Sequence, residues 1–595
     1  MGDAGGASES VKVGFRLDSN LLSAAAVSIL FLVSFFLWTL PFQHNRLPFG
    51  EGDSAWHFAI GDNIASSDKA TFRLPYYVGI WYYSFNRILG PFAPEYLPSS
   101  HVNYALMQFF GGERFVPVFI YRAIASFLGA LAVFFVISRL FGVLPGFLAG
   151  LGLSFSLREQ MTYLFGQQPT LTAILITPVA TYAWYKYLAS FYDNDSSGTG
   201  SGGNKTYLFV TLALLASQYM LHIQGFAASS ILIAVFTVLM VIRFRRLPVS
   251  KANIANLAVA AVIFAAVAAP FAAIYFGAPE NPPSFKVGRL FEWGISPDYV
   301  VGSFPPAFVL FSAEYHNYLL AFLFAGIALL LVRVFLVKNN VKELFLLSWL
   351  IGTYVVLHSD LFLVSNTARL ARMLVLEHYI FFSLIALSVV WLPSTVSSLI
   401  KLDKSKGVVF VAKYALASVL VISLVLTSGK ATYSSLKDAY GGIARLTPVQ
   451  AEFAEWLGAN VPEKAYIYDP ASKIIGQWQY PKLRWMLAIS QRHVGTNDFS
   501  VIATADNIDK NNTYFLFDYS DAALLASSPA YQQQALAWAA QLQQLERSVF
   551  NNTAPVYDSN NIRLYRYDMT KDLAKVTAKS ITQFAESVSE ATEAN

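Results

Sequence analysis

The sequence predicts a polytopic α-helical membrane protein with about 11–13 transmembrane helices and a C-terminal extracytoplasmic α/β domain. Three observations predict this fold class. Of the 595 residues, 55% are apolar and only 13% are charged, which lies outside the range of ordinary soluble domains. Apolar runs long enough to cross a bilayer recur along the chain and stop after Thr427. Beyond that residue, short alternating segments and amphipathic helical patterns take over.

The first apolar run, Leu21 to Pro41, has the length of a membrane-spanning helix, and no small-residue cleavage site follows it. We therefore interpret it as a retained anchor. About ten further runs follow, and the shorter ones give the total a margin of roughly two helices. These runs are Val116 to Ile137, Val143 to Leu157, Thr170 to Leu188, Leu208 to Leu221, Ala227 to Ile242, Ile254 to Phe276, Leu319 to Val337, Leu344 to Leu357, Tyr379 to Leu392 and Val408 to Leu426.

Lysines and arginines in the short loops set the orientation, because these charges resist translocation. With the N-terminus inside, the basic loops all fall on the cytoplasmic side. An odd number of crossings then places loop 42–114 and everything after Thr427 on the outer face. The net charge is only +5 and no basic patch is present, so nothing favours a nucleic-acid partner. The basic loops are Arg139, Arg243 to Arg246, Lys338 to Lys342 and Lys401 to Lys406.

We divide the chain into a transmembrane domain (1–427, with outer loop 42–114), an extracytoplasmic α/β domain (428–568) and a polar tail (569–595). The absence of cysteine excludes disulfides, thiolate catalysis and cysteine-ligated metals. No repeat relates one half of the membrane region to the other, which weighs against a repeat-built transporter. In the α/β domain we expect helices at Thr447 to Leu457 and Tyr531 to Leu545, and strands at Ala465 to Tyr468, Tyr514 to Phe517 and Ile562 to Tyr567.

Acidic and imidazole side chains gather directly after the first predicted membrane helix. Glu51 and Asp53 are two residues apart, and His57 follows Asp53 by one helical turn. This group could bind a divalent cation such as Mg²⁺ or Mn²⁺, or Asp53 could act as a general base toward a hydroxyl nucleophile. The alternative is that Asp53 caps a helix beginning at Ser54. At a membrane boundary, such a carboxylate could act on a substrate whose tail lies in lipid and whose head lies in water.

The segment Glu51 to Phe58 resembles the first acidic motif of the GT-C glycosyltransferases, particularly the catalytic subunit of archaeal and eukaryotic oligosaccharyltransferases. In that family the motif also follows the first transmembrane helix. The resemblance implies a multi-pass cell-membrane enzyme that transfers a sugar or oligosaccharide from a polyprenyl (dolichyl) phosphate or pyrophosphate. The acceptor would be a protein or a glycan on the outer face. Asp53 would activate this acceptor or hold a metal ion.

A second segment, Gln477 to Pro481, resembles the WWDYG motif of archaeal oligosaccharyltransferases. Trp478 and Tyr480 keep their places, whereas glutamines and a proline replace the other three residues. The family uses this tryptophan and aspartate pocket to hold the hydroxyl group of a sequon serine or threonine, and a glutamine cannot supply the same charge. The alternative is that Trp478 and Tyr480 alternate along a strand edge and serve only in packing.

The family's second acidic motif would lie on the outer side between the third and fourth helices. At that place the sequence has Gln167 and Gln168, which can hydrogen-bond a sugar but bind divalent cations poorly. Glu159 could substitute as the acid if the loop folds back. The alternative is a salt bridge between Glu159 and its neighbour Arg158.

Two further candidates lie in later outer segments. Glu314 matches in position a loop glutamate that contacts the acceptor amide in the family, and its alternative is an ordinary interface residue. Arg369 and Arg372 are three residues apart on one helical face, where they could neutralise a departing lipid phosphate or pyrophosphate. An arginine in the corresponding helix of the family does this. A catalytically silent paralogue and a lipid-linked sugar flippase or transporter remain as alternative functions.

Overall fold

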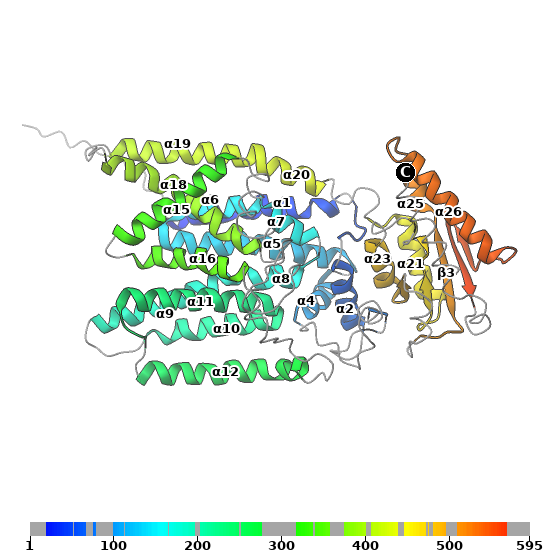
Figure 1. The fold of residues 1–595 in the computed structure, drawn as a ribbon, viewed down its shortest axis with the longest axis horizontal. Helices are drawn as coiled ribbons and strands as arrows, with labels where there is room; N and C mark the ends of the chain where they lie inside the picture. Colours follow the sequence, from blue (N-terminus) through cyan, green and yellow to red (C-terminus); the bar gives the residue numbers. More distant parts are fainter. Residues whose placement is uncertain are drawn as a thin grey trace, which may run out of the picture.

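A bundle of mostly long helices forms one region, and a smaller C-terminal unit built on a β-sheet lies against one end of it (Figure 1). The computed structural model describes residues 19–43, 45–50, 53–66, 75, 77–78, 99–111, 114–164, 166–196, 203–248, 251–276, 317–336, 340–357, 374–399, 406–437, 445–471, 474, 480–495 and 508–567. The predicted site residues Glu51, Glu314, Arg369, Arg372 and Trp478 lie outside these ranges.

Six of the described helices are long and apolar enough to cross a membrane, so the chain is a multi-pass membrane protein. The last of them, α19 (Lys406–Leu424), continues through the π-helical turn η3 (Val425–Gly429) into α20 (Lys430–Lys437), past the domain boundary expected at residue 427. The other helices of this region are α1 (Ser19–Gln43), α2 (Ser54–Ser66), α4 (Ser99–Gly111), α5 (Val116–Phe141), α6 (Val143–Ser154), α7 (Leu157–Leu164), α8 (Gln168–Ile174), α9 (Thr177–Ser196), α10 (Lys205–Leu221), α11 (Ile223–Phe244), α12 (Lys251–Phe276), α15 (Asn317–Leu336), α16 (Val341–Leu357) and α18 (Leu374–Leu399).

Helix α6 packs closely on α1 and α18 because glycines line its surface. A Cβ atom at Gly150 would lie 2.9 Å from the Leu30 side chain of α1, and one at Gly152 would lie 2.3 Å from the Phe382 ring of α18. In a lipid environment, helices associate through such close backbone approach rather than through the hydrophobic effect. These contacts hold α6 against α18 and against α1, the helix that leads into the candidate site.

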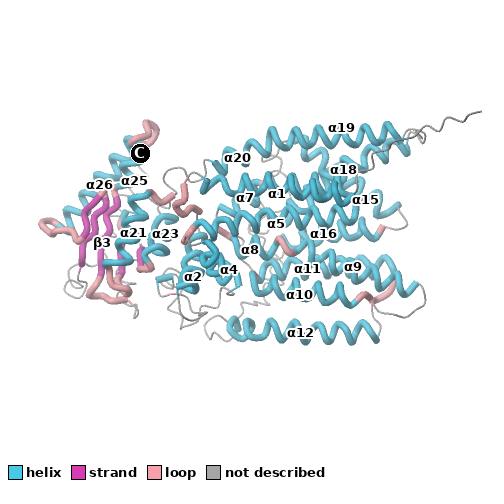
Figure 2. The backbone as a smooth tube through the Cα atoms, turned by 180° about the vertical axis from the view of Figure 1, so that it is seen from behind, coloured by secondary structure: helices cyan, strands magenta, loops and turns pink. Residues whose placement is uncertain are grey.

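The C-terminal unit is an α/β domain around a five-stranded mixed sheet of order β2-β1-β3-β5-β4. Strand β1 pairs in parallel with β2 and β3, and β5 pairs antiparallel with β3 and β4. Figure 2 shows the sheet between its helices. The elements are α21 (Pro448–Asn460), β1 (Tyr466–Tyr468), α23 (Tyr480–Ser490), β2 (His493–Gly495), β3 (Thr513–Asp518), α25 (Ser520–Ala526), α26 (Gln532–Phe550), β4 (Tyr557–Ser559) and β5 (Ile562–Tyr567).

Alternate residues of β3 face two different cores, as the two-residue period of a strand requires. Tyr514 and Leu516 belong to the large core that continues into the membrane region. Phe515 and Phe517 pack on the opposite face against Phe550 of α26, with ring centroids 5.2 and 5.9 Å away. One face of the sheet is therefore joined to the helical bundle, and the other is covered by α26.

Most expected elements are present, with two differences. The single run expected over Thr170 to Leu188 consists of two helices, α8 and α9, which a short turn separates. The strand edge considered for Trp478 and Tyr480 is wrong at Tyr480, because this residue begins helix α23. Pro481 explains the difference, since proline favours the first turn of a helix, where its missing N–H group is not needed.

Candidate functional site

The basic loops around Arg243 and Lys342 lie at one end of the helical bundle, and the loop that ends at Asp53 lies at the opposite end. At one end, Arg243 Nε donates to Asn340 Oδ1 (3.2 Å), and Lys342 Nζ donates to the carbonyl oxygen of Leu140, near the end of α5 (3.0 Å). The other end of α5 lies beside the Asp53 loop and the C-terminal domain (Figure 1). Basic loops that the sequence predicts on one side of the membrane therefore meet at one end of the fold.

Asp53 immediately precedes α2. Its carbonyl oxygen accepts the hydrogen bond of the His57 N–H group at 3.0 Å, which is the first bond of the helix, so Asp53 occupies the N-cap position. The partial positive charge of a helix N-terminus stabilises a carboxylate at this position. Asp53 therefore stands at the capping position that the sequence offered as an alternative, and its side chain is half-buried.

Two buried arginines hold the chain just before Asp53. The guanidinium groups of Arg122 and Arg445 lie 5.6 and 5.5 Å from the ring centroid of Phe49. Arg445 also donates to the carbonyl oxygens of Pro41 (2.6 Å) and Leu47 (2.8 Å). Burial lowers the pKa of Arg445 to about 10, so the group stays charged at neutral pH. The end of α1 and the loop that follows it are fixed by these contacts.

The Asp53 loop packs directly against the turn between α7 and α8. Gly50 and Gly166 both have positive φ angles, +114° and +75°. A Cβ atom at Gly166 would lie 2.2 Å from the backbone nitrogen of Ser54, and one at Gly50 would lie 2.2 Å from the Ser54 hydroxyl oxygen. Gly166 precedes Gln167, which is the N-cap residue of α8. The segment around Asp53 and the segment around Gln167, which the sequence analysis compared with the two acidic motifs, therefore meet at Ser54.

His57 is buried and faces a second histidine. Its Nδ1 atom lies 3.0 Å from Nε2 of His101 in α4, a hydrogen bond in which one imidazole donates and the other accepts. This bond ties α2 to α4 beneath the N-cap position of Asp53. His57 therefore has a defined ring orientation one turn from the carboxylate.

Glu159 lies deeper in the helical bundle than the contact between Ser54 and Gly166. Its carboxylate and the Tyr379 hydroxyl meet beside Gly129, where a Cβ atom would lie 3.1 and 2.7 Å from their oxygens. Gly129 is midway along α5, and the rise of α7 puts Glu159 about 10 Å below Gly166. The structure therefore does not bring Glu159 to Asp53. Among the described ion pairs, none joins Glu159 to Arg158.

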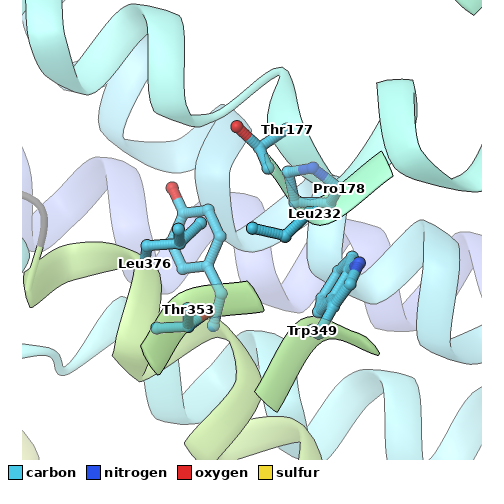
Figure 3. A pocket seen from close by; sticks show the side chains of 7 residues that line it. Thr177, Pro178, Leu232, Trp349, Thr353 and Leu376 are labelled. Carbon is cyan, nitrogen blue, oxygen red and sulfur yellow. The ribbon is translucent and has the colours of Figure 1, made fainter. Parts of the chain in front are cut away.

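A narrow gap between α9, α11, α16 and α18 lies on another side of Tyr379 (Figure 3). The gap has apolar walls and is too narrow to admit a water molecule. Thr177, which lines it, already accepts hydrogen bonds from Gln218 (3.0 Å) and Ser229 (2.9 Å). We interpret this gap as an imperfection in helix packing and not as a substrate pocket.

The C-terminal domain is bound to residues of the segment 42–114 by polar contacts. Arg114 forms an ion pair with Asp62 of α2 (2.6 Å) and donates to the backbone oxygens of Ala488 (3.2 Å) and Ile489 (3.0 Å) in α23. Gln491 Nε2 donates to the same Asp62 carboxylate at 3.0 Å. Helix α23, which begins at the predicted site residue Tyr480, is therefore attached to the helix that Asp53 caps.

Several residues of the site were not found from the sequence. Gly166 and Arg445 gave no signal, because their roles depend on partners distant along the chain. Arg122 did give a signal in the sequence, because burying an arginine inside an apolar run costs free energy unless the residue has a function or a partner. Of the residues predicted, the structure gathers Asp53, His57 and the Gln167 backbone around Ser54, and it places Tyr480 in the attached domain.

The residues described around Asp53 fit a divalent cation poorly. Within the described ranges, no group of three or more histidine, aspartate or glutamate side chains is clustered to hold a metal ion. The segment that meets the Asp53 loop carries Gln167 and Gln168, whose neutral amide oxygens are weak ligands compared with carboxylates. We therefore derive no catalytic step through a metal.

Comparison with known proteins shows that the chain has the GT-C membrane glycosyltransferase fold. It is similar to the apo oligosaccharyltransferase of Archaeoglobus fulgidus (TM-score 0.52, 14% identity, 87% of this chain and 71% of that one). It is also similar to Archaeoglobus fulgidus AglB in complex with an inhibitory peptide and a dolichol-phosphate (TM-score 0.53, 14% identity, 89% and 72%).

A third similar structure is ArnT from Cupriavidus metallidurans bound to undecaprenyl phosphate (TM-score 0.53, 10% identity, 91% of this chain and 97% of that one). No family model matches the chain, and no curated protein matches it by sequence. At these identities the similarity concerns the fold, and the activity has to be argued from the site.

Proposed function

We propose that this chain is a GT-C glycosyltransferase that moves a sugar or oligosaccharide from a polyprenyl (dolichyl) phosphate or pyrophosphate to an acceptor protein or glycan. The observation that carries the proposal is the packing of Ser54 against Gly166, which unites the Asp53 loop with the Gln167 segment beneath the C-terminal domain. The proteins of similar fold bind a peptide and dolichol-phosphate in one case and undecaprenyl phosphate in the other.

In the proposed reaction, Asp53 accepts a proton from the acceptor nucleophile while that atom attacks the anomeric carbon of the sugar. The bond from this carbon to the lipid phosphate oxygen breaks, and the phosphate leaves with the electron pair. Arg369 and Arg372 would meet the charge that develops on the leaving group. This chemistry needs both groups on the extracytoplasmic side, which is where we propose that the C-terminal domain lies.

The remaining candidates have supporting roles in this proposal. Gln167 would hydrogen-bond sugar hydroxyls, and His57, held by His101, would keep the start of α2 in place beneath Asp53. Glu159 would lie beside Tyr379 at a distance from the reacting atoms and would not take part in the transfer step. Glu51 would act beside Asp53 in catalysis, while Glu314, Trp478 and Tyr480 would contact the acceptor, as the family resemblance implies.

The test compares purified full-length protein with Asp53→Asn in liposomes that contain a labelled polyprenyl-linked sugar and candidate acceptors. We expect lipid-dependent transfer by the unmodified protein and a loss of at least about a hundredfold in the variant, since general-base catalysis contributes about that much or more. Asp558→Asn, at an exposed position on β4, is the matched control and should retain full activity.

Full activity in Asp53→Asn would remove Asp53 from the mechanism. If the unmodified protein moves the labelled lipid across the bilayer without forming product, the flippase alternative is supported instead. If neither transfer nor movement is detected with any donor, the chain behaves as a catalytically silent paralogue. The neutral Gln167 and Gln168 at the second motif favour this last outcome over the flippase.

A further inference from the structure

Helix α23 of the C-terminal domain carries a tryptophan that reaches the Asp53 loop. Trp485 is 1% exposed, and its ring lies 5.6 Å from the Phe58 ring of α2 and 6.2 Å from the Phe119 ring of α5 (centroid distances). Phe119 in turn stacks on Phe49 at 4.4 Å. A continuous aromatic contact therefore joins the C-terminal domain to the residue just before Gly50.

Trp485 also makes a polar contact with that loop. Its indole N–H group donates to the carbonyl oxygen of Gly50 at 3.2 Å. The peptide group of Gly50 is turned toward α23 by a φ angle of +114°, which glycine adopts readily and other residues rarely do. Asp53 follows three residues later, so this bond fixes a backbone carbonyl group close in sequence to the N-cap position.

Helix α23 is itself fixed at both ends, so Trp485 is presented by a rigid element. In its first turn, Lys482 is buried in an ion pair with Asp521 of α25, and Gln450 of α21 also donates to Asp521 (3.3 Å). At its last turn, Arg114 donates to backbone oxygens of α23, as described above. A side chain presented by such an element can hold its partner loop in one geometry.

We propose that Trp485 is a positioning residue for Asp53 and that α23 couples acceptor binding to the geometry of the Asp53 loop. The helix begins at Tyr480, within the Gln477–Pro481 segment, and Trp485 lies five residues further along it, about 7.5 Å away. An acceptor held at the start of α23 is therefore connected to Gly50 by a single rigid helix, which keeps the acceptor and the Asp53 loop in one relative position. This inference rests on the proposed function for its catalytic meaning.

The indole N–H group can be removed while most of the ring is kept. Trp485→Phe retains the aromatic contacts with Phe58 and Phe119 and leaves the Gly50 carbonyl without this donor. Since the transfer step needs the carboxylate in one geometry, we expect kcat to fall about tenfold while the acceptor KM changes less than twofold. Trp456→Phe is the matched control, because Trp456 packs on Phe453 and Tyr557 within the C-terminal domain.

A second measurement separates this inference from the proposed function. Backbone hydrogen exchange of the peptide covering residues 49–58, measured on the full-length protein, should rise severalfold in Trp485→Phe and stay unchanged in Trp456→Phe. This readout needs no substrate, so it tests the positioning role even if transfer is never observed. Unchanged exchange together with unchanged kcat in Trp485→Phe would overturn the proposal.

If Trp485→Phe fails to fold, a second variant that loosens α23 without changing Trp485 still tests the proposal. Gln491→Leu removes the donor to Asp62 just beyond the end of α23. We expect the same pattern on a smaller scale, with faster exchange at residues 49–58 and a kcat reduced about twofold to threefold. If Gln491→Leu accelerates exchange only within the C-terminal domain, then α23 does not control the loop and the coupling is refuted.

Discussion

At the scale of single residues, two glycines decide whether the Asp53 loop and the Gln167 segment can meet. Gly50 and Gly166 both approach Ser54 more closely than any side chain would allow. Neither belongs to a recognisable motif, because each glycine fits a partner more than a hundred residues away, Ser54 for Gly166 and the Leu164 carbonyl oxygen for Gly50. The sequence could therefore indicate Asp53 as a candidate but could not reveal the packing that places it.

Gly166→Ala should disrupt this contact. The new methyl group would lie 2.2 Å from the Ser54 nitrogen and 2.4 Å from its Cα, and backbone atoms cannot rotate aside as a flexible side chain can. We expect transfer activity to fall at least about tenfold, because displacing a reacting group by about 1 Å can cost that much or more. The measurement is the initial rate of product formation in liposomes.

Gly142→Ala is the control for this prediction. Gly142 also has a positive φ angle, +105°, but its added Cβ would meet nothing within 4 Å. The Gly142→Ala variant should therefore show the effect of backbone strain alone, with a lower midpoint of thermal unfolding and nearly normal transfer activity. Equal activity losses in the two variants would mean that strain, and not the contact with Ser54, explains the effect.

At the scale of elements, the apolar runs could be predicted well because length and composition alone decide whether a helix can span a bilayer. Helix α23 could not. The alternation of Trp478 and Tyr480 suggested a strand, yet the residues that follow Pro481 are buried on a helix against α2 and α21. Tertiary packing overrides a two-residue pattern in so short a segment. Trp485 consequently escaped notice as a candidate.

The buried ion pair between Lys482 and Asp521, which anchors α23, predicts an unusual pH dependence of the stability of the C-terminal domain. Burial and the nearby charge of Asp518 raise the pKa of Asp521 to about 6, although the Lys482 ammonium opposes the shift. Between about pH 4 and pH 6 the folded protein therefore binds a proton that the unfolded chain does not. The contribution of this group to the free energy of unfolding should accordingly increase as the pH falls from 7 to 5.

Lys482→Met tests this anchor. The substitution leaves the Asp521 carboxylate buried without its cation, which should destabilise the domain by about 3 kcal/mol at pH 7.5. The loss should be smaller at pH 5, where Asp521 can take up a proton instead. Limited proteolysis of the domain at the two pH values measures the difference. An equal loss at both would show that the ionisation of Asp521 does not govern this site.

At the scale of the whole molecule, the membrane region and the C-terminal domain are joined by one continuous interface. The large hydrophobic core runs from the membrane helices through α2 and α23 to one face of the sheet. The ion pair of Arg114 with Asp62 closes the polar edge of the same interface. The strand pattern alone predicts the C-terminal domain as a separate unit. Because the hydrophobic core is continuous, this domain nevertheless contributes helix α23 to the candidate site of the membrane region.

The absence of cysteine allows the orientation of the molecule to be measured directly. Single cysteines are introduced by Ala530→Cys, exposed between α25 and α26, and by Leu247→Cys, exposed beyond α11 at the end that carries the basic loops. Positively charged loops are retained on the cytoplasmic side. A membrane-impermeant maleimide should therefore label the first variant on intact cells and the second only after lysis, while the unmodified protein stays unlabelled in both. Labelling of Leu247→Cys alone on intact cells would reverse the orientation, and it would place Asp53 on the side opposite to the one where we propose that transfer occurs.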